Sequence, residues 1–518
     1  MSSSCLRLRS LCRWHLLQPR QAGPAPRRGK ATTSSAVDGL QRLKTLQELP
    51  GPGVLGSMYW YLIRGYILHT HQLQVIHKKL YGPLWKYVMG KYTSVAIASP
   101  ELMEKVLRQE GRFPTRCDMA LWKEHRDLRG LAYGPLTEDG ERWHRLRQVL
   151  NQRMLKPSAA VLYAGAINEV VSDLMVRLQD ERAGSPSGVL VRDVANVLYR
   201  FALEGTRGWG VLERAPAGTS AHPRGVDLSR LNSERDRIFQ LCQRLMPHLA
   251  TVPASILGRK MIDRRVEEIA ARLEKGEEPP RGGTLTYLLS SGNLSIEEVN
   301  GSVAELLMAG VDTTSNTLAW ALYHLAQEPE TQEALYREVT SVVPRDCIPS
   351  APYLAKMPLL KAVIKETLRL YPVVPANSRV VVEKDIVLWE YHFPKGTMFA
   401  FGHFALSRDE SNFPEPDKFL PRRWLREHSP SHHPFSSIPF GYGVRACVGR
   451  RIAELEMHLA LARIIQTFEL RPDPELRDVK PLSRIVLVAN KPINLQLLDR
   501  QTDIFPAQTA EVTSRATS

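Results

Sequence analysis

The 518-residue sequence has little cysteine and lacks a long apolar run. Its six cysteines are scattered singly, with no C-x-x-C pair, which argues against a disulfide-rich secreted scaffold and favours a reducing compartment or one special thiol. No segment reaches the ~18–20 uncharged apolar residues of a membrane span. The nearest, Gly53 to Ile63, is cut short by Arg64 and Gly65. With its aromatic residues it fits either a bilayer surface or a core helix.

Acidic residues are absent before Asp38, in a stretch rich in Arg, Ser and Ala. The basic residues in this stretch are Arg7, Arg9, Arg13, Arg20, Arg27, Arg28 and Lys30. Such composition predicts an organelle transit peptide over residues 1–37, with a disordered basic tail as the alternative. Of the formal net charge of +15, roughly +8 is left for the body, spread rather than clustered, so we expect no nucleic-acid binding.

The body is 43% apolar by the whole-chain average and is expected to be folded and mainly helical. Apolar residues at i, i+3 and i+4 predict helices over 100–110, 140–155, 158–182, 255–275, 296–327, 330–342, 358–370 and 449–468. Strands around turns are predicted over 85–97 and 379–388. Between Gly205 and Asp227, Gly, Pro and Arg replace any apolar period, which predicts a long irregular loop.

The strongest chemical signal is the sequence F-G-Y-G-V-R-A-C-V-G, from Phe440 to Gly449, followed at once by an amphipathic helix. Its glycines let the backbone fold tightly around Cys447, and the helix directs its positive end toward the sulfur. Such surroundings stabilise a thiolate. A single thiolate without a second Cys or His suits the axial position of a haem iron, and an inert buried thiol is the alternative.

These residues resemble the haem-binding loop of the cytochrome P450 monooxygenases, and further motifs match in the family's order over about residues 70–500. The resemblance implies a mainly α fold, with a large helical domain and a small β-rich N-terminal subdomain. It implies one catalytic domain over 38–505 and a disordered tail over 506–518. The cofactor implied is heme b, iron protoporphyrin IX, with Cys447 as the axial ligand and Phe440, Arg445 and Gly449 in cofactor contact.

The second motif, Ala309-Gly310-Val311-Asp312-Thr313-Thr314, lies in the middle of the helix predicted over 296–327. A capping box, Ser295 with Glu298, predicts where this helix begins. Gly310 and the two threonine hydroxyls, which can bond back to carbonyls, predict a local opening. An acid beside an alcohol suits proton delivery to iron-bound dioxygen, which gives Asp312 and Thr313 catalytic roles and places Ala309 over the haem.

The remaining motifs are supporting ones. Glu366 and Arg369 share a helix face, and in the family this pair is buried and joined by a later arginine, here Arg423, in a structural role. Trp143 and Arg147 match the family's W-x-x-x-R, whose N–H groups bind haem propionates. Arg379 and Arg445 match the other propionate-binding positions.

The leader points to a mitochondrial member of the family, reduced by a small acidic ferredoxin (adrenodoxin) and its NADPH-dependent reductase. An acidic partner needs a basic patch, for which we predict Lys361, Lys365, Arg450 and Arg451, with a plain solvated face as the alternative. The expected location is the matrix side of the inner mitochondrial membrane, in peripheral contact with it, as a monomer.

Longer stretches, such as 309–325, 359–379 and 449–457, resemble the branch of the family that hydroxylates sterol side chains. This implies O₂-dependent oxidation of a terminal methyl (26/27-hydroxylation) in bile acid synthesis, with 25-hydroxylation of vitamin D as a second activity. The sister branch, which 1α-hydroxylates 25-hydroxyvitamin D, is the first alternative. The sequence departs from the family over 205–257, where helices that roof the substrate pocket are expected.

Two further hypotheses stay open. A thiolate-haem isomerase that works on peroxides would need no acid–alcohol pair, and the presence of Asp312 and Thr313 argues against it. A variant that binds haem or sterol without turnover is motivated by the unusual interval over 205–257.

Overall fold

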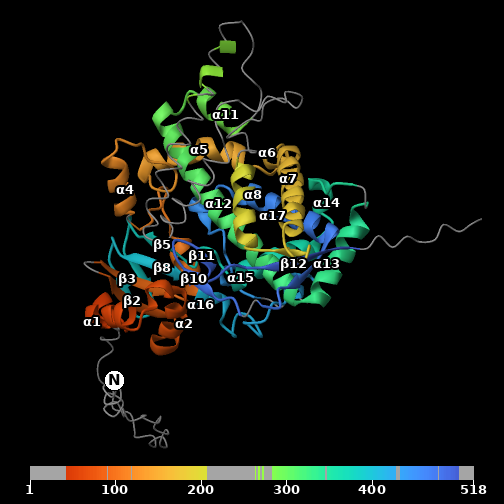
Figure 1. Cartoon of the computed structure of the whole chain (residues 1–518). Coiled ribbons are helices and arrows are strands. Elements are labelled where there is room, and N and C mark those ends of the chain that lie inside the picture. Colours follow the sequence, from red (N-terminus) through yellow and green to blue (C-terminus); the bar gives the residue numbers. More distant parts are fainter. Residues whose placement is uncertain are drawn as a thin grey trace, which may run out of the picture. The chain divides into compact units, whose positions relative to one another are not determined.

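The computed structural model describes residues 42–89, 92–117, 119–206, 263, 266–268, 271–272, 283–344, 347–427, 432–475 and 478–500. From Leu43 onward the described residues belong to one compact unit. Most of them are helical, with small sheets beside the helices (Figure 1). This is the mainly α architecture that the sequence predicts.

The α-helices in this part of the chain are α1 (Val54–Met58), α2 (Thr70–Tyr81), α3 (Pro100–Leu107), α4 (Ala120–Asp127), α5 (Gly140–Met154), α6 (Pro157–Val161), α7 (Ala164–Ala183), α8 (Val194–Thr206), α11 (Thr284–Ser290), α12 (Ile296–Gln327), α13 (Pro329–Val342), α14 (Ala351–Leu354), α15 (Pro358–Leu370), α16 (His403–Ser407) and α17 (Arg450–Thr467). Short 3₁₀ or π turns occur at η1 (Leu46–Glu48), η2 (Tyr59–Ile63), η3 (Tyr66–Leu68), η6 (Pro421–Trp424), η7 (Pro434–Ser436) and η8 (Gly443–Arg445).

The strands are β1 (Lys44–Thr45), β2 (Leu84–Met89), β3 (Tyr92–Ile97), β4 (Leu190–Val191), β5 (Ala376–Val380), β6 (Ile386–Leu388), β7 (Tyr391–Phe393), β8 (Met398–Gly402), β9 (Phe468–Pro472), β10 (Pro481–Ser483), β11 (Leu487–Ala489) and β12 (Leu495–Asp499). They form sheets of order β2-β3-β8-β5, β4-β12-β9, β1-β7-β6 and β10-β11.

Most of the predicted elements are confirmed, because their end signals are local. Helix α12 begins with the predicted capping box between Ser295 and Glu298, and α15 begins at Pro358 and ends before Tyr371. The prediction of one helix over 158–182 is wrong. At Leu162 and Tyr163 the chain tightens into i to i−3 hydrogen bonds and divides it into α6 and α7.

The division of this helix serves the core. It turns the Tyr163 ring inward, where the residue is 7% exposed and its hydroxyl lies 3.0 Å from the Thr284 hydroxyl. The spacing of apolar residues does not predict so short a 3₁₀ turn, because the apolar residues before and after it keep the same helical period.

The predicted irregular interval over 205–257 is mostly outside the described residues. Only Gly205 and Thr206 are described, and they still belong to α8. Of the helix predicted over 255–275, only residues 263, 266–268 and 271–272 are described, and they are helical.

The central element of the helical core is α12, against which α8, α15 and α17 pack (Figure 1). Its C-terminal half is apolar and buried on nearly all sides, as expected for a helix surrounded by others. Trp320 of this half is fully buried and stacks on Tyr371 with 4.0 Å between the ring centroids. No helix in the described ranges is long and apolar enough to cross a bilayer.

The four-stranded sheet combines two distant parts of the chain. Strands β2 and β3 form an antiparallel pair, and β3 then pairs in parallel with β8, with Ser94 opposite Met398. Strand β5 completes the sheet against β8. The β-rich part is therefore built from N-terminal strands together with strands from the second half, and the predicted strand segment over 379–388 divides between β5 here and β6 in another sheet.

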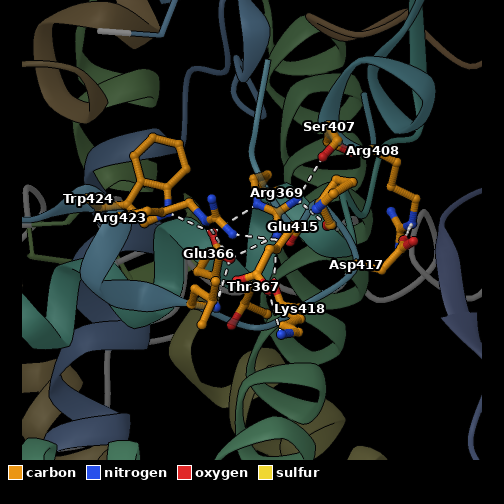
Figure 2. A network of polar contacts seen from close by, with 12 residues as sticks. Glu366, Thr367, Arg369, Ser407, Arg408, Glu415, Asp417, Lys418, Arg423 and Trp424 are labelled. Atoms are coloured by element: carbon orange, nitrogen blue, oxygen red, sulfur yellow. Dashed lines mark hydrogen bonds and ion pairs between the residues drawn. The ribbon is translucent and has the colours of Figure 1, made fainter. Parts of the chain in front are cut away.

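A fully buried carboxylate, that of Glu366 on α15, collects a polar network (Figure 2). Both Glu366 oxygens accept from Arg369, at 2.8 and 2.9 Å. Arg423 Nε donates to the same carboxylate at 3.0 Å and the Trp424 indole N–H at 2.8 Å. Arg369 in turn donates to the carbonyls of Ser407, Pro416 and Lys418, so the network fastens the whole segment over 407–424 to α15.

Removing one charge from this network should leave the other buried without compensation. We expect Arg369→Ala to lower the free energy of unfolding by about 3–5 kcal/mol. The control is Arg337→Ala on α13, whose side chain is 77% exposed and pairs with Glu333, and for which we expect less than about 1 kcal/mol. Urea unfolding followed by circular dichroism measures both. Equal losses in the two variants would contradict the structural role of the buried network.

Candidate functional site

The Cys447 loop folds as its glycines require. Gly441 and Gly443 have φ of 73° and 70°, in the left-handed region that residues with a Cβ rarely adopt. The loop closes through the Cys447 amide, which donates to the Phe440 carbonyl at 2.8 Å. Gly449 is the N-cap of α17, and its backbone N–H hydrogen-bonds to the sulfur.

Cys447 keeps an exposed surface although protein surrounds it closely. Burial raises the pKa of its thiol, while the Gly449 N–H and the positive charges of Arg147, Arg116 and Arg450 lower it. A lone exposed thiol at the N-terminus of a long helix, facing several cations, is able to bind a soft metal as its thiolate.

Four arginines gather around this thiol. They are Arg116, Arg147, Arg379 and Arg445, and each affects the protonation of another arginine or of the thiol. Burial, together with repulsion between the arginines, lowers the pKa of Arg147 to about 10 and that of Arg445 to about 9. Arg147 donates to the carbonyls of the loop residues Ala446 and Val444 at 2.8 and 3.2 Å.

The two carboxylates in this cluster are Glu110 and Asp139. Glu110 pairs with Arg379, and Asp139 accepts from Arg445 at 2.6 Å. Four guanidinium groups thus face two carboxylates, and Asp139 also pairs with Lys123 at 3.1 Å, so the cluster carries a surplus of positive charge. Within the described residues, the buried N–H groups Arg116 Nε, Arg147 Nε and Arg445 Nη1 also have no hydrogen-bond partner. Buried unpaired donors and surplus charge are costly, so the site suits an anionic ligand.

Trp143, one turn before Arg147 on α5, is 1% exposed. The Arg445 guanidinium stacks over its ring at 4.0 Å from the centroid. The structure therefore brings together Trp143 and the three arginines predicted from the sequence, and Trp143 also acts as the aromatic support of one of them.

The middle of α12 is accessible, whereas both flanks are buried. Residues 301–307 and 314–323 are buried, but Ala309 is exposed and residues 310–313 are half-buried. Thr313 donates to the Ala309 carbonyl at 2.7 Å. The predicted bond from Thr314 is wrong, since its buried hydroxyl has no partner among the described residues. The predicted local opening is absent as well, since α12 is one continuous α-helix from Ile296 to Gln327.

Asp312 lies in this window with its carboxyl largely desolvated. Burial raises its pKa to about 6, and a hydrogen bond from the Tyr199 side chain on α8 acts in the opposite direction. A carboxyl that titrates near neutral pH is populated in both forms, which is what a proton relay needs.

The segment that leads from α4 to α5 is fixed to α12 one turn before this window. Glu305, 1% exposed, accepts from the amides of Gly134 and Leu136 and pairs with Arg126 at 3.2 Å. Gly301 permits the close approach, because a Cβ there would lie 2.6 Å from the Ala132 carbonyl oxygen.

The predicted docking residues are less uniform than expected. Lys365 is exposed, but Lys361 is half-buried and donates to the Ala355 carbonyl at 3.3 Å. Arg450 and Arg451 are 47% and 45% exposed and both pair with Glu454 on their own helix. Lys365 is the most available cation of the four.

Comparison with known proteins gives the family. The family model described as Cytochrome P450 matches residues 50–212 and 225–497. The chain belongs to the cytochrome P450 family. It is 47% identical to the mitochondrial sterol 26-hydroxylase of Oryctolagus cuniculus over 96% of this chain and 99% of the relative. For the same enzyme of Homo sapiens the identity is 49% over 89% and 90%.

A second group of relatives is also similar. The mitochondrial 25-hydroxyvitamin D-1 alpha hydroxylase of Homo sapiens is 43% identical over 88% of this chain and 93% of the relative. The interruption of the P450 family match, between residues 212 and 225, falls inside the interval that the sequence marks as irregular.

The P450 cofactor is a haem whose iron is bound by a cysteine thiolate. The residues around Cys447 fit this group. The surplus of positive charge and the unpartnered arginine N–H groups suit the propionates, and the exposed thiol suits an iron ligand.

Two residues that contact the predicted site residues lie outside the sequence motifs. Arg116, in R-F-P-T-R, donates to the Arg445 carbonyl at 2.9 Å and lies in the charge cluster. Tyr199, on α8, contacts Asp312. Neither lies in one of the quoted motifs, and only the arginine-rich spacing before Cys117 hints at the first.

We expect Arg116→Gln to release haem about 10–100-fold faster, since it removes a charge-assisted hydrogen bond from the cluster. The rate of haem transfer to apomyoglobin measures this. Arg153→Gln is the matched control. Arg153 on α5 stacks over the Tyr287 ring at 4.6 Å and is not one of the four cluster arginines, so its replacement should leave the rate of haem release unchanged. Release from both variants at the parent rate would show that Arg116 does not hold the cofactor.

Proposed function

We propose that this chain is a mitochondrial haem-thiolate monooxygenase that hydroxylates the side chain of a sterol. The observation that carries the proposal is the near full-length identity of 46–49% to mitochondrial sterol 26-hydroxylases, combined with a Cys447 site suited to haem. The identity to the human 25-hydroxyvitamin D-1 alpha hydroxylase is lower, at 43%, so the sterol side chain is preferred over the secosteroid ring.

In this proposal Cys447 would bind the haem iron through its sulfur. The propionates would be held by Trp143, Arg116, Arg147, Arg379 and Arg445. Phe440 and Gly449 shape the loop around the sulfur. The bound haem supplies activation of dioxygen for insertion into a C–H bond.

The chain's own residues supply the rest. Asp312, with a pKa raised to about 6 by burial, holds and releases a proton at its carboxyl. Thr313 Oγ1 is fixed by its bond to the Ala309 carbonyl and offers a hydroxyl in the same accessible part of α12. Ala309, exposed and small, leaves room for an apolar substrate beside α12.

The electron donor in this proposal is a small acidic ferredoxin, reduced by an NADPH-dependent reductase. Lys365 is exposed, 5.8 Å from the Trp424 ring centroid, on the helix that bears Glu366. Lys361, Arg450 and Arg451 add positive charge, although the pairing with Glu454 reduces the share of the two arginines.

Peripheral contact with the inner mitochondrial membrane, from the matrix side, is supported by the first helical segment. Leu55, Leu62 and Ile63 are 82%, 64% and 77% exposed, with Tyr59 and Ile67 beside them also exposed. An exposed apolar segment of this kind suits insertion into a bilayer surface and supports that interpretation of 53–63 over a core helix. Flotation with vesicles, compared with a Leu55→Ser, Ile63→Ser double variant, tests the contact.

The decisive experiment is reconstitution of the haem-loaded chain with mitochondrial ferredoxin, its reductase, NADPH and O₂. We expect cholesterol-derived sterols to gain one oxygen on the terminal side-chain methyl, detected by mass spectrometry. Cys447→Ser should lose both the thiolate Soret spectrum and product. Turnover on 25-hydroxyvitamin D alone would favour the 1α-hydroxylase, and haem binding without any product would favour a non-catalytic variant. Peroxide isomerisation without reductant would favour the isomerase.

Charge reversal tests the docking surface. We expect Lys365→Glu to raise the ferredoxin concentration for half-maximal turnover roughly tenfold while leaving kcat unchanged, because a long-range attraction becomes a repulsion. The effect should shrink as salt is added. Lys79→Glu, at an exposed position on α2, is the control; equal effects in both variants would assign the change to net charge alone.

A further inference from the structure

The Asp312 carboxyl faces a partner on a neighbouring helix. Tyr199 of α8 makes a side-chain hydrogen bond with it, and α8 packs along α12 at this level. Burial raises the pKa of the Tyr199 phenol far above its ordinary value, so the hydroxyl stays protonated and is always available as a donor.

Asn316, one turn after Asp312, sets the direction of this bond. Its side-chain amide donates to the Tyr199 hydroxyl at 3.0 Å and to the Asp312 backbone carbonyl at 2.8 Å. Because the phenol oxygen accepts from the amide, its single proton is left for the carboxylate. The Ser315 hydroxyl also interacts with Tyr199, so three polar side chains from about one turn of α12, those of Asp312, Ser315 and Asn316, surround the phenol oxygen.

Other charged groups on the packed elements do not replace Tyr199. The charged residues of α8 are Arg200 and Glu204, and Glu204 pairs with Arg177 of α7 at 3.7 Å. Within the described residues, burial and the Tyr199 hydroxyl are the two influences on the protonation of Asp312. The partner of the Asp312 carboxyl is therefore a neutral tyrosine hydroxyl. A cation at the same place would keep that carboxyl ionised.

We infer that Tyr199 is a positioning residue for Asp312, whose hydroxyl, aimed by Asn316, fixes the direction of the carboxyl and sets how readily it takes a proton. The inference rests on the proposed function, because it assumes that Asp312 relays protons in a monooxygenase.

The sign of the effect follows from the two opposing influences. Burial favours the neutral carboxyl, and the hydrogen bond from Tyr199 favours the carboxylate. Without the hydroxyl, the pKa of Asp312 rises further and the carboxyl stays protonated to higher pH. The acid limb of the turnover profile then moves upward, and less of the reductant consumed appears as product near neutral pH.

The test is Tyr199→Phe in the haem-loaded protein, which keeps the ring and removes only the hydroxyl. In the resting protein without turnover, infrared spectra follow the protonated-carboxyl band against pH, and Asp312→Asn identifies that band by its disappearance. We expect the titration midpoint to rise by roughly one to two units, the size expected for one hydrogen bond to a charged group. Product per NADPH should fall near pH 7, with KM for the sterol unchanged.

Tyr163→Phe is the matched control. That tyrosine is also buried in the helical core, but its hydroxyl contacts Thr284, so its removal should leave the Asp312 midpoint where it is. Replacing Tyr199 by 3-fluorotyrosine, a stronger donor of the same shape, should lower the midpoint, which tests the inference even if the phenylalanine variant folds poorly.

The outcomes separate this inference from the proposed function. An unchanged midpoint in both Tyr199 variants overturns the inference, whatever the enzyme's activity. The second outcome is that the Asp312 midpoint shifts in the Tyr199 variants while the parent protein forms no hydroxylated sterol. This result would leave the positioning role in place and overturn the proposed function instead.

Discussion

A surplus of buried positive charge beside one thiol is the constraint on which this structure depends. Four guanidinium groups meet two carboxylates around Cys447, and several of their N–H groups have no partner within the described residues. Such an arrangement is costly in the empty protein and becomes favourable when anionic groups complete it. The elements that supply these arginines, α5, β5, the loop before Cys447 and the segment around Arg116, therefore have a common electrostatic reason to meet.

The central helix shows a second compromise, between rigidity and access. Most of α12 is buried and would serve as a plain core helix, yet six of its residues around Ala309 are accessible. The polar groups there bond back to their own backbone or across to α8. The helix thereby offers polar chemistry without giving up its continuity, and the Glu305 contacts hold the neighbouring segment against it.

The sequence predicted the parts of the fold whose causes are local. Capping residues and prolines placed the ends of α12 and α15, and loop glycines located the bend at Cys447. The division between α6 and α7 could not be predicted, because the apolar period continues across it, and the contact between Tyr163 and Thr284 joins residues more than a hundred positions apart. The same holds for the site: the motif residues were found, but Arg116 and Tyr199 matter only through partners that the fold brings to them.

The parallel pairing of β3 with β8 bears on how this protein comes to be made. Ser94 on β3 pairs with Met398 on β8, about 300 residues later, so the sheet cannot form until β8 has been synthesised. The segment bound by Glu366 is synthesised just after β8. A nascent chain would thus emerge with an unfinished sheet edge for most of its translation, which invites chaperone binding and slow maturation. If the leader directs import, the late formation of this sheet would keep the chain unfolded until it has crossed into the organelle.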